Sequence, residues 1–95
     1  MSDIIDAAVA ALTEKLNGGF DGVAKFVIPG EGAIMMDGAG VRAGDDEADV
    51  TLTADADTFR AILEGDLNPT MAFMTGKLAV DGSMAMAMKL GSALS

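Results

Sequence analysis

Cysteine, histidine, tyrosine and tryptophan are all absent from this 95-residue chain. Without cysteine there can be no disulfide, no thiolate nucleophile and no cysteine metal ligand. Without histidine there is no imidazole ligand and no histidine general base. An enzyme would have to be assembled from Asp, Glu, Lys or Ser, and no paired constellation of these residues stands out. The sequence therefore predicts a protein that is not an enzyme, with no catalytic residues, no metal site and no cofactor.

Long apolar runs and basic residues are also scarce. No run approaches the ~20 residues that span a membrane, and the N-terminal stretch carries Asp3 and Asp6 where a signal peptide needs basic residues. Fifteen acidic residues against six basic ones give a formal net charge of −9. Because such a chain repels phosphates, nucleic acids and anionic membranes are poor partners. We expect a soluble, cytoplasmic protein with a single domain over residues 1–95.

Helical and strand patterns alternate along the rest of the chain. The first segment has apolar residues at helical spacing up to Leu16, and period-two patterns then predict strands. Helical signals return after the cap Asp55, and again after Asn68 and Pro69. Glycine-containing hairpin turns between the early strands favour antiparallel pairing. The predicted strands cover residues 23–30, 33–37, 41–43, 49–53 and 77–81, and the predicted helices after Asp55 and Asn68 cover 56–64 and 69–75.

The stretch SMAMAMKL, residues 83–90, has methionine at every second position, which taken alone suggests a strand. Met, Ala, Lys and Leu all favour helix, and the leading serine is a good N-cap, so we predict a helix. On that helix Met84 and Met88 fall on one side, whereas Met86 and Leu90 fall roughly opposite. The apolar arc is wider than one docking face requires, which indicates a second apolar contact besides the sheet.

The short helix before it shows the same feature, because Met71 and Met74 flank Phe73 and lie on different sides. Methionine is unbranched and polarisable, so it adapts to ligands of varied shape. Methionines can also simply fill gaps in a core that has few aromatic residues. Because they gather in two late helices, we favour a surface that binds a ligand.

The stretch GDLNPTMAFMTGKLAVDGSMAMAMKL, residues 65–90, resembles the sterol carrier protein type-two domain, with matching residues that are dense and in register. Residues 48–65 resemble the family more loosely, and the first 40 residues agree mainly in element order. Two departures bear on the ligand. This chain has Ala79 where the family often has lysine, and its second strand lacks the usual aromatic residue.

The resemblance implies an α/β (α+β) fold, in which helices cover a five-stranded mixed, largely antiparallel sheet and enclose an apolar tunnel. Such domains bind and transfer or present a lipid, for instance a fatty acid, a fatty acyl-CoA, a sterol or a phospholipid, and do no chemistry. Positions carried over from the family become candidates for the wall and mouth of this tunnel, and we add the apolar stripe of the helix at 56–64. The candidate lipid-binding residues are Phe59, Ile62, Leu63, Leu67, Met71, Phe73, Met74, Met84 and Met88.

Other interpretations stay open. An interaction module would use an exposed methionine-rich face to dock a partner protein, such as a lipid-modifying enzyme, or a second copy of the chain. An acyl carrier protein would attach its prosthetic arm to Ser83, but such proteins are all-helical with the serine near mid-chain. The acidic stretch 44–51 alternates like a calcium loop, yet it lacks the required glycine and the closing glutamate.

Lysine residues offer one polar contact for such a ligand. Lys25, Lys77 and Lys89 are candidates to meet a carboxylate or phosphate near a tunnel mouth, although solvated surface lysines are the simpler interpretation.

Overall fold

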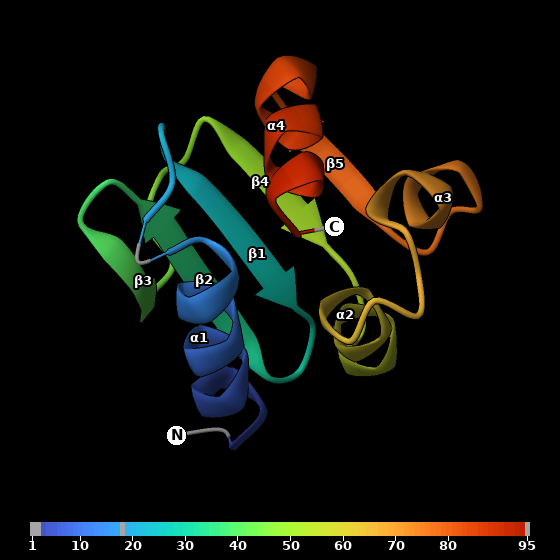
Figure 1. Cartoon of the computed structure of the whole chain (residues 1–95), viewed down its shortest axis with the longest axis horizontal. Helices are drawn as coiled ribbons and strands as arrows, with labels where there is room; N and C mark the ends of the chain where they lie inside the picture. Colours follow the sequence, from blue (N-terminus) through green and yellow to red (C-terminus); the bar gives the residue numbers. More distant parts are fainter. Residues whose placement is uncertain (1–2, 18, 95) are drawn as a thin grey trace.

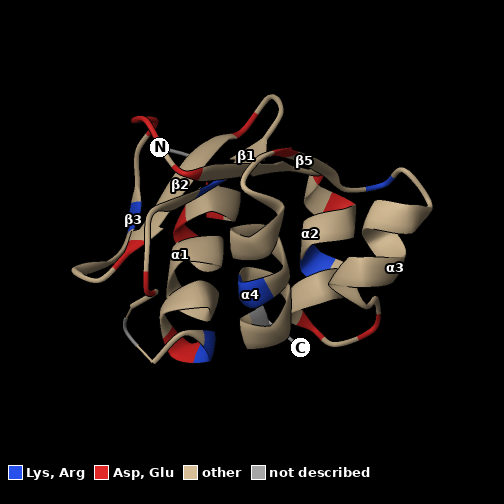
Figure 2. Ribbon diagram, turned by 90° about the horizontal axis from the view of Figure 1, so that it is seen from above, with Lys and Arg blue, Asp and Glu red and all other residues tan. Residues whose placement is uncertain are grey.

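In the part of the chain that the structure describes, four helices lie on one face of a five-stranded sheet (Figure 1, Figure 2). The computed structural model of the chain describes residues 3–17 and 19–94. The strand order is β3-β2-β1-β4-β5, with β1 parallel to β4 and every other neighbouring pair antiparallel. The predicted mixed, largely antiparallel sheet covered by helices is therefore confirmed. The elements are α1 (Asp3–Lys15), β1 (Ala24–Ile28), β2 (Gly32–Asp37), β3 (Gly40–Ala43), β4 (Val50–Thr53), α2 (Ala56–Leu63), α3 (Pro69–Met74), β5 (Ala79–Gly82) and α4 (Met84–Leu94).

Between β3 and β4 the chain crosses the sheet on the face away from the helices. Lys25 and Met35, cross-strand partners on β1 and β2, mark this face. The Lys25 Nζ atom lies 2.8 Å from Asp45 Oδ1, and the backbone N–H of Asp49 donates to the Val23 carbonyl at 2.9 Å. The crossing segment covers Met35, which is only 1% exposed. The acidic residues of this segment therefore help to hold the crossover that places β4 beside β1.

The core lies between the sheet and the helices. Phe26 and Ile28 on β1 and Leu12 on α1 are completely or almost completely buried. Successive side chains of a strand point to opposite faces, so every second residue of β1 joins this core. The first helix ends as expected near Asn17, which adopts a positive φ of 53°.

The two predicted caps are present at the starts of α2 and α3. The Asp55 carboxylate accepts a hydrogen bond from the Thr58 N–H at 2.7 Å, and Asn68 Oδ1 accepts from the Thr70 N–H at 2.8 Å. Such bonds satisfy amides that have no partner inside the helix. They fix where both short helices begin.

The last strand begins at Ala79, two residues later than the sequence predicted. The backbone N–H groups of Lys77 and Leu78 instead donate to the carbonyl of Ala72, at 2.9 and 3.0 Å. These bonds close the C-terminal end of α3. The two residues are therefore used to end a helix and are not available to pair with β4.

Candidate functional site

A cavity of about 280 Å³ lies between the sheet and helices α3 and α4. Its floor is a row of three apolar side chains on adjacent strands, Phe26, Leu52 and Val80. Phe26 of β1 is in register with Leu52 of β4, which is in register with Val80 of β5. The sheet register therefore forms the floor, and the helices supply the walls.

Helix α4 presents two different apolar faces. Met84, Ala87, Met88 and Gly91 line the cavity, and their spacing of three and four residues places them on one side of the helix. Leu90, on the other side, is completely buried in the core. This confirms both the predicted helix and the prediction that its two faces have different contacts.

Contacts on the core side and at the start of α4 fix its position. The Ser83 hydroxyl accepts a hydrogen bond from the Met86 N–H at 3.3 Å, so this serine is an N-cap. A side chain at Gly22 would collide with the Met86 thioether, and Gly22 has a φ of +123°. Glycine is thus required where the chain passes beneath α4.

Helix α3 forms the outer wall of the cavity. Pro69, Thr70, Phe73 and Met74 line it, whereas Ala72 faces the core and is fully buried. The helix approaches α4 closely, because a Cβ atom placed on Gly91 would lie 3.6 Å from the Pro69 Cβ. The cavity is therefore bounded by α3 and α4, which approach each other closely at one end.

The structure brings five of the nine candidate residues together around this cavity, namely Ile62, Phe73, Met74, Met84 and Met88. The other four lie outside the lining. Phe59 is 2% exposed and packs behind Phe26, with ring centroids 4.2 Å apart and planes at 57°. Leu63 and Leu67 are partly buried against the core, and Met71 is 53% exposed on the outside of α3.

Eight lining residues are absent from the candidate set. Three of them, Phe26, Leu52 and Val80, lie on predicted strands, but the sequence does not reveal that these strands are neighbours. Ala87 and Gly91 share a helix face with Met84 and Met88, so helical spacing alone could have identified them as lining residues. The remaining three are Pro69, Thr70 and Leu78.

The cavity is almost entirely apolar. Among the described residues that line it, Thr70 alone has a polar side chain, and none is titratable. Phe73, Met74, Met84 and Met88 border the cavity and are also 41%, 74%, 48% and 72% exposed to solvent. The cavity therefore opens to solvent between α3 and α4, and it offers apolar contact with almost no polar recognition.

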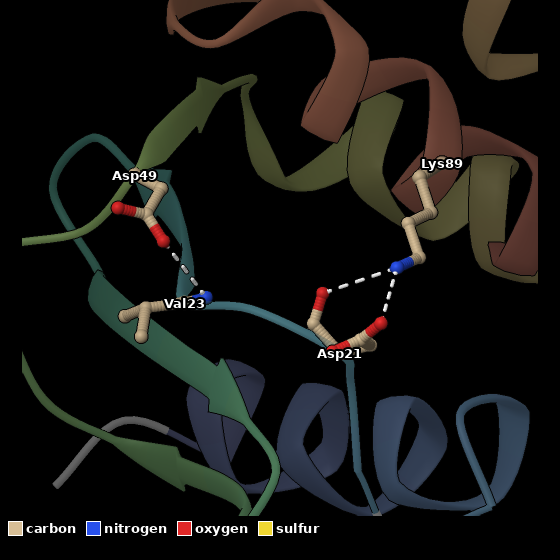
Figure 3. Close-up of polar contacts among 4 residues, drawn as sticks. All are labelled: Asp21, Val23, Asp49 and Lys89. Atoms are coloured by element: carbon tan, nitrogen blue, oxygen red, sulfur yellow. Dashed lines mark hydrogen bonds and ion pairs between the residues drawn. The ribbon is translucent and has the colours of Figure 1, made fainter.

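Two of the three candidate lysines are paired away from this cavity. Lys25 lies on the opposite face of the sheet. Lys89 of α4 binds Asp21, with its Nζ atom 2.7 Å from the Asp21 carboxylate and 3.4 Å from the Asp21 carbonyl oxygen (Figure 3). The hydrogen bond and positive charge of Lys89 hold the pKa of the Asp21 carboxyl below its ordinary value. Lys89 therefore ties α4 to the loop before β1.

The third lysine, Lys77, follows α3. Its positive charge makes a minor contribution to lowering the pKa of Asp55, after the hydrogen bonds that this carboxylate accepts from Thr58. None of the three lysines is part of the cavity lining.

Within residues 3–17 and 19–94, no helix has the length and apolar character needed to cross a membrane.

The chain matches known proteins along nearly its whole length. The family model described as SCP-2 sterol transfer family matches residues 5–95. Hydroxysteroid dehydrogenase-like protein 2 from Bos taurus is 36% identical over 88 residues, which make up 93% of this chain and 20% of that protein. The protein of the same name from Danio rerio is 42% identical over 78 residues, which are 73% of this chain and 19% of that protein. The chain thus spans about a fifth of the length of these relatives.

Solved structures share the fold. Sterol carrier protein 2 from Aedes aegypti, in complex with the C16 fatty acid palmitate, is 26% identical with a TM-score of 0.77, and the match covers 100% of this chain and 97% of that one. Sterol carrier protein 2 like 2 from Aedes aegypti has a TM-score of 0.78 at 21% identity, covering 94% of both chains. At that identity the second likeness shows the fold alone.

Proposed function

Because the chain belongs to the SCP-2 sterol transfer family, we propose that it binds the apolar part of a lipid in the cavity between α3, α4 and the sheet. The observation that carries this proposal is the cavity itself, which has a volume of about 280 Å³, an apolar lining and an opening to solvent. Binding sites for small molecules are typically concave and largely apolar. The lipid-contacting residues would be Ile62, Phe73, Met74, Met84 and Met88, together with the strand residues of the floor.

Energetics favour an occupied cavity. At ~24 cal/mol per Å³, a dry and enclosed void of 280 Å³ would cost about 7 kcal/mol, which is an upper value here because the cavity opens to solvent. The whole stability of a small domain is roughly 5–15 kcal/mol. A ligand that fills the space restores packing contacts to the lining and stabilises the fold. Burying about 14 methylenes is worth roughly 11 kcal/mol, against an association and ordering cost of about 4–15 kcal/mol.

The lining also constrains how the lipid would lie. A carboxylate or phosphate is costly to bury without a partner, and Thr70 alone offers a polar side chain among the described lining residues. The polar end of the ligand would therefore remain at the opening between α3 and α4. Affinity would follow the apolar area buried, so ligands with a long alkyl chain are suitable probes.

We further propose that the chain carries or presents the lipid without changing it chemically. The described lining residues include no carboxylate, lysine or serine that could act as base, acid or nucleophile. The dehydrogenase-like relatives are about five times longer than this chain, so their names say little about this domain alone. A lipid recovered from the purified protein should therefore have the same mass before and after prolonged incubation.

Palmitate binding tests the proposal, because a similar protein has been solved with that fatty acid. Native mass spectrometry of freshly purified protein should show a bound lipid, and titration with a fluorescent fatty acid should saturate at one ligand per chain. Competition by unlabelled palmitate should displace the probe. Absence of saturable binding, together with dimerisation that rises with concentration, would instead support an interaction module with an exposed methionine-rich face.

A further inference from the structure

Thioether groups surround the opening of the cavity. Among the described residues, the large hydrophobic side chains that are exposed are Met71, Phe73, Met74, Met84 and Met88, all on α3 and α4. Three of the four methionines, Met74, Met84 and Met88, also line the cavity. We call these three the mouth methionines. Their sulfur-bearing side chains are reachable from solvent and would contact a bound lipid.

The composition makes methionine the preferred target of a mild oxidant in this protein. Cysteine, histidine, tyrosine and tryptophan are absent, whereas methionine occurs eight times. No other sulfur-containing side chain competes for a peroxide. Met35 and Met36 on β2 are 1% and 0% exposed, so the fold shields them from an oxidant in solution. Oxidation should therefore be directed to the helices that form the cavity mouth.

We propose that the mouth methionines are a reversible oxidation site that controls lipid affinity. This inference rests on the proposed function, because it concerns the same cavity. Hydrogen peroxide transfers one oxygen atom to the thioether sulfur. The peroxide O–O bond breaks, a sulfur–oxygen bond forms with the electron pair of the sulfur, and water leaves. The product is a methionine sulfoxide. Methionine sulfoxide reductases convert it back to the thioether with two electrons and two protons from a dithiol, and the oxygen leaves as water.

The sulfoxide changes the cavity from an apolar surface to a polar one. Its oxygen needs a hydrogen-bond partner that an alkyl chain does not provide, so covering it with lipid is unfavourable. The fold itself is preserved, because Met35 and Met36 remain thioethers inside the protein. Since Met74 and Met88 are 74% and 72% exposed, their sulfoxides stay solvated when the cavity is empty. Oxidation thus favours the empty state over the lipid-bound state.

Peptide mapping tests the selectivity. After graded hydrogen peroxide treatment, trypsin should release peptides 26–42, 61–77 and 78–89, which separate the buried methionines from those of α3 and α4. We expect the oxygen adducts to appear first in 61–77 and 78–89, at least about tenfold faster than in 26–42, because reactivity follows exposure. Equal rates in all three peptides would overturn the proposal.

Affinity measurements test the effect. Titration with a fluorescent fatty acid should show binding about tenfold weaker after oxidation, and treatment with methionine sulfoxide reductases for both epimers should restore it. A protein that does not bind the probe before oxidation contradicts the proposed function. A protein that binds the probe equally well before and after oxidation contradicts only this inference.

Two matched variants locate the effect. The triple variant Met74→Leu, Met84→Leu and Met88→Leu replaces all three thioethers with apolar side chains of similar volume. Each protein is compared with its own affinity before oxidation, and in the triple variant peroxide should leave that affinity unchanged. Met71→Leu changes an exposed methionine outside the lining, so this variant should remain sensitive. Circular dichroism before and after treatment establishes that the fold persists. Continued loss of affinity in the oxidised triple variant would overturn the proposal.

Discussion

Replacing Ala87 by leucine should fill part of the cavity from within α4. Ala87 is partly buried and lines the cavity on the same helix face as Met84 and Met88. Leucine is nearly as good a helix former as alanine, so the helix itself should not be weakened. Three added carbons at ~0.8 kcal/mol each give an upper value of about 2.4 kcal/mol. We expect the free energy of unfolding to rise by about 1–2 kcal/mol, because the new side chain also loses rotamer freedom.

Urea denaturation followed by far-ultraviolet circular dichroism measures this change, since the chain has no tryptophan to report by fluorescence. A gain of 1 kcal/mol should raise the melting temperature by about 4–8 °C in a domain of this size. Ala10→Leu, at an exposed position of α1, is the matched control and should leave stability unchanged within about 0.5 kcal/mol.

The same variant must also bind lipid more weakly. We expect the affinity of Ala87→Leu for a fluorescent fatty acid to fall by about tenfold, because the leucine takes the place of about two methylenes of the ligand. In a space that is already filled, the added carbons would instead destabilise the fold by about 1–3 kcal/mol. Destabilisation together with unchanged binding would refute the assignment of the cavity.

Three further outcomes follow from the caps and the packing of the helices. Thr58 donates its backbone N–H to Asp55 and lowers the pKa of that carboxylate in the folded state. The charged carboxylate therefore stabilises the fold above the ordinary aspartate pKa of about 3.9. This stabilisation is lost as the pH falls through the lowered pKa. On acidification, the urea midpoint of the wild type should thus fall more than that of Asp55→Asn. At neutral pH the two midpoints should be similar, because asparagine also caps helices. Parallel pH profiles of the two proteins would contradict this. Asn68→Ala removes the cap of α3 and should cost about 1 kcal/mol in a urea melt, with Asn68→Asp as a control that retains most of the stability. Gly22 has a φ of +123°, which residues with a Cβ atom rarely adopt, so Gly22→Ala should melt clearly below the wild type. An unchanged melting temperature would contradict this backbone conformation.

Local features of the chain were predictable from the sequence because they depend on neighbouring residues. The caps Asp55 and Asn68, the inward positions of β1 and the helix at 84–94 all follow from short-range patterns. The same holds for the two faces of α4, since helical geometry alone separates Met84 from Leu90. The family resemblance seen in residues 65–90 was also confirmed, with a match that extends over residues 5–95.

The composition of the cavity depends on contacts that are distant in sequence. Phe26 and Val80 meet Leu52 only because β4 inserts between β1 and β5, and no short-range pattern specifies that order. Phe59 was grouped with Ile62 because both lie on the apolar stripe of α2, yet Phe59 is buried against the ring of Phe26 and does not line the cavity. Met71 was grouped with Met74, although the direction of a side chain on a six-residue helix depends on how that helix docks.

Methionine methyl resonances provide the most direct test of the central claim, that a lipid chain enters the cavity between α3 and α4. Protein labelled with carbon-13 at the methionine methyl groups would be titrated with palmitate and followed by NMR. We predict saturable shifts of the Met74, Met84 and Met88 signals, with little change at Met35. Palmitate binding that shifts none of those three signals, or no binding at all, would contradict the account.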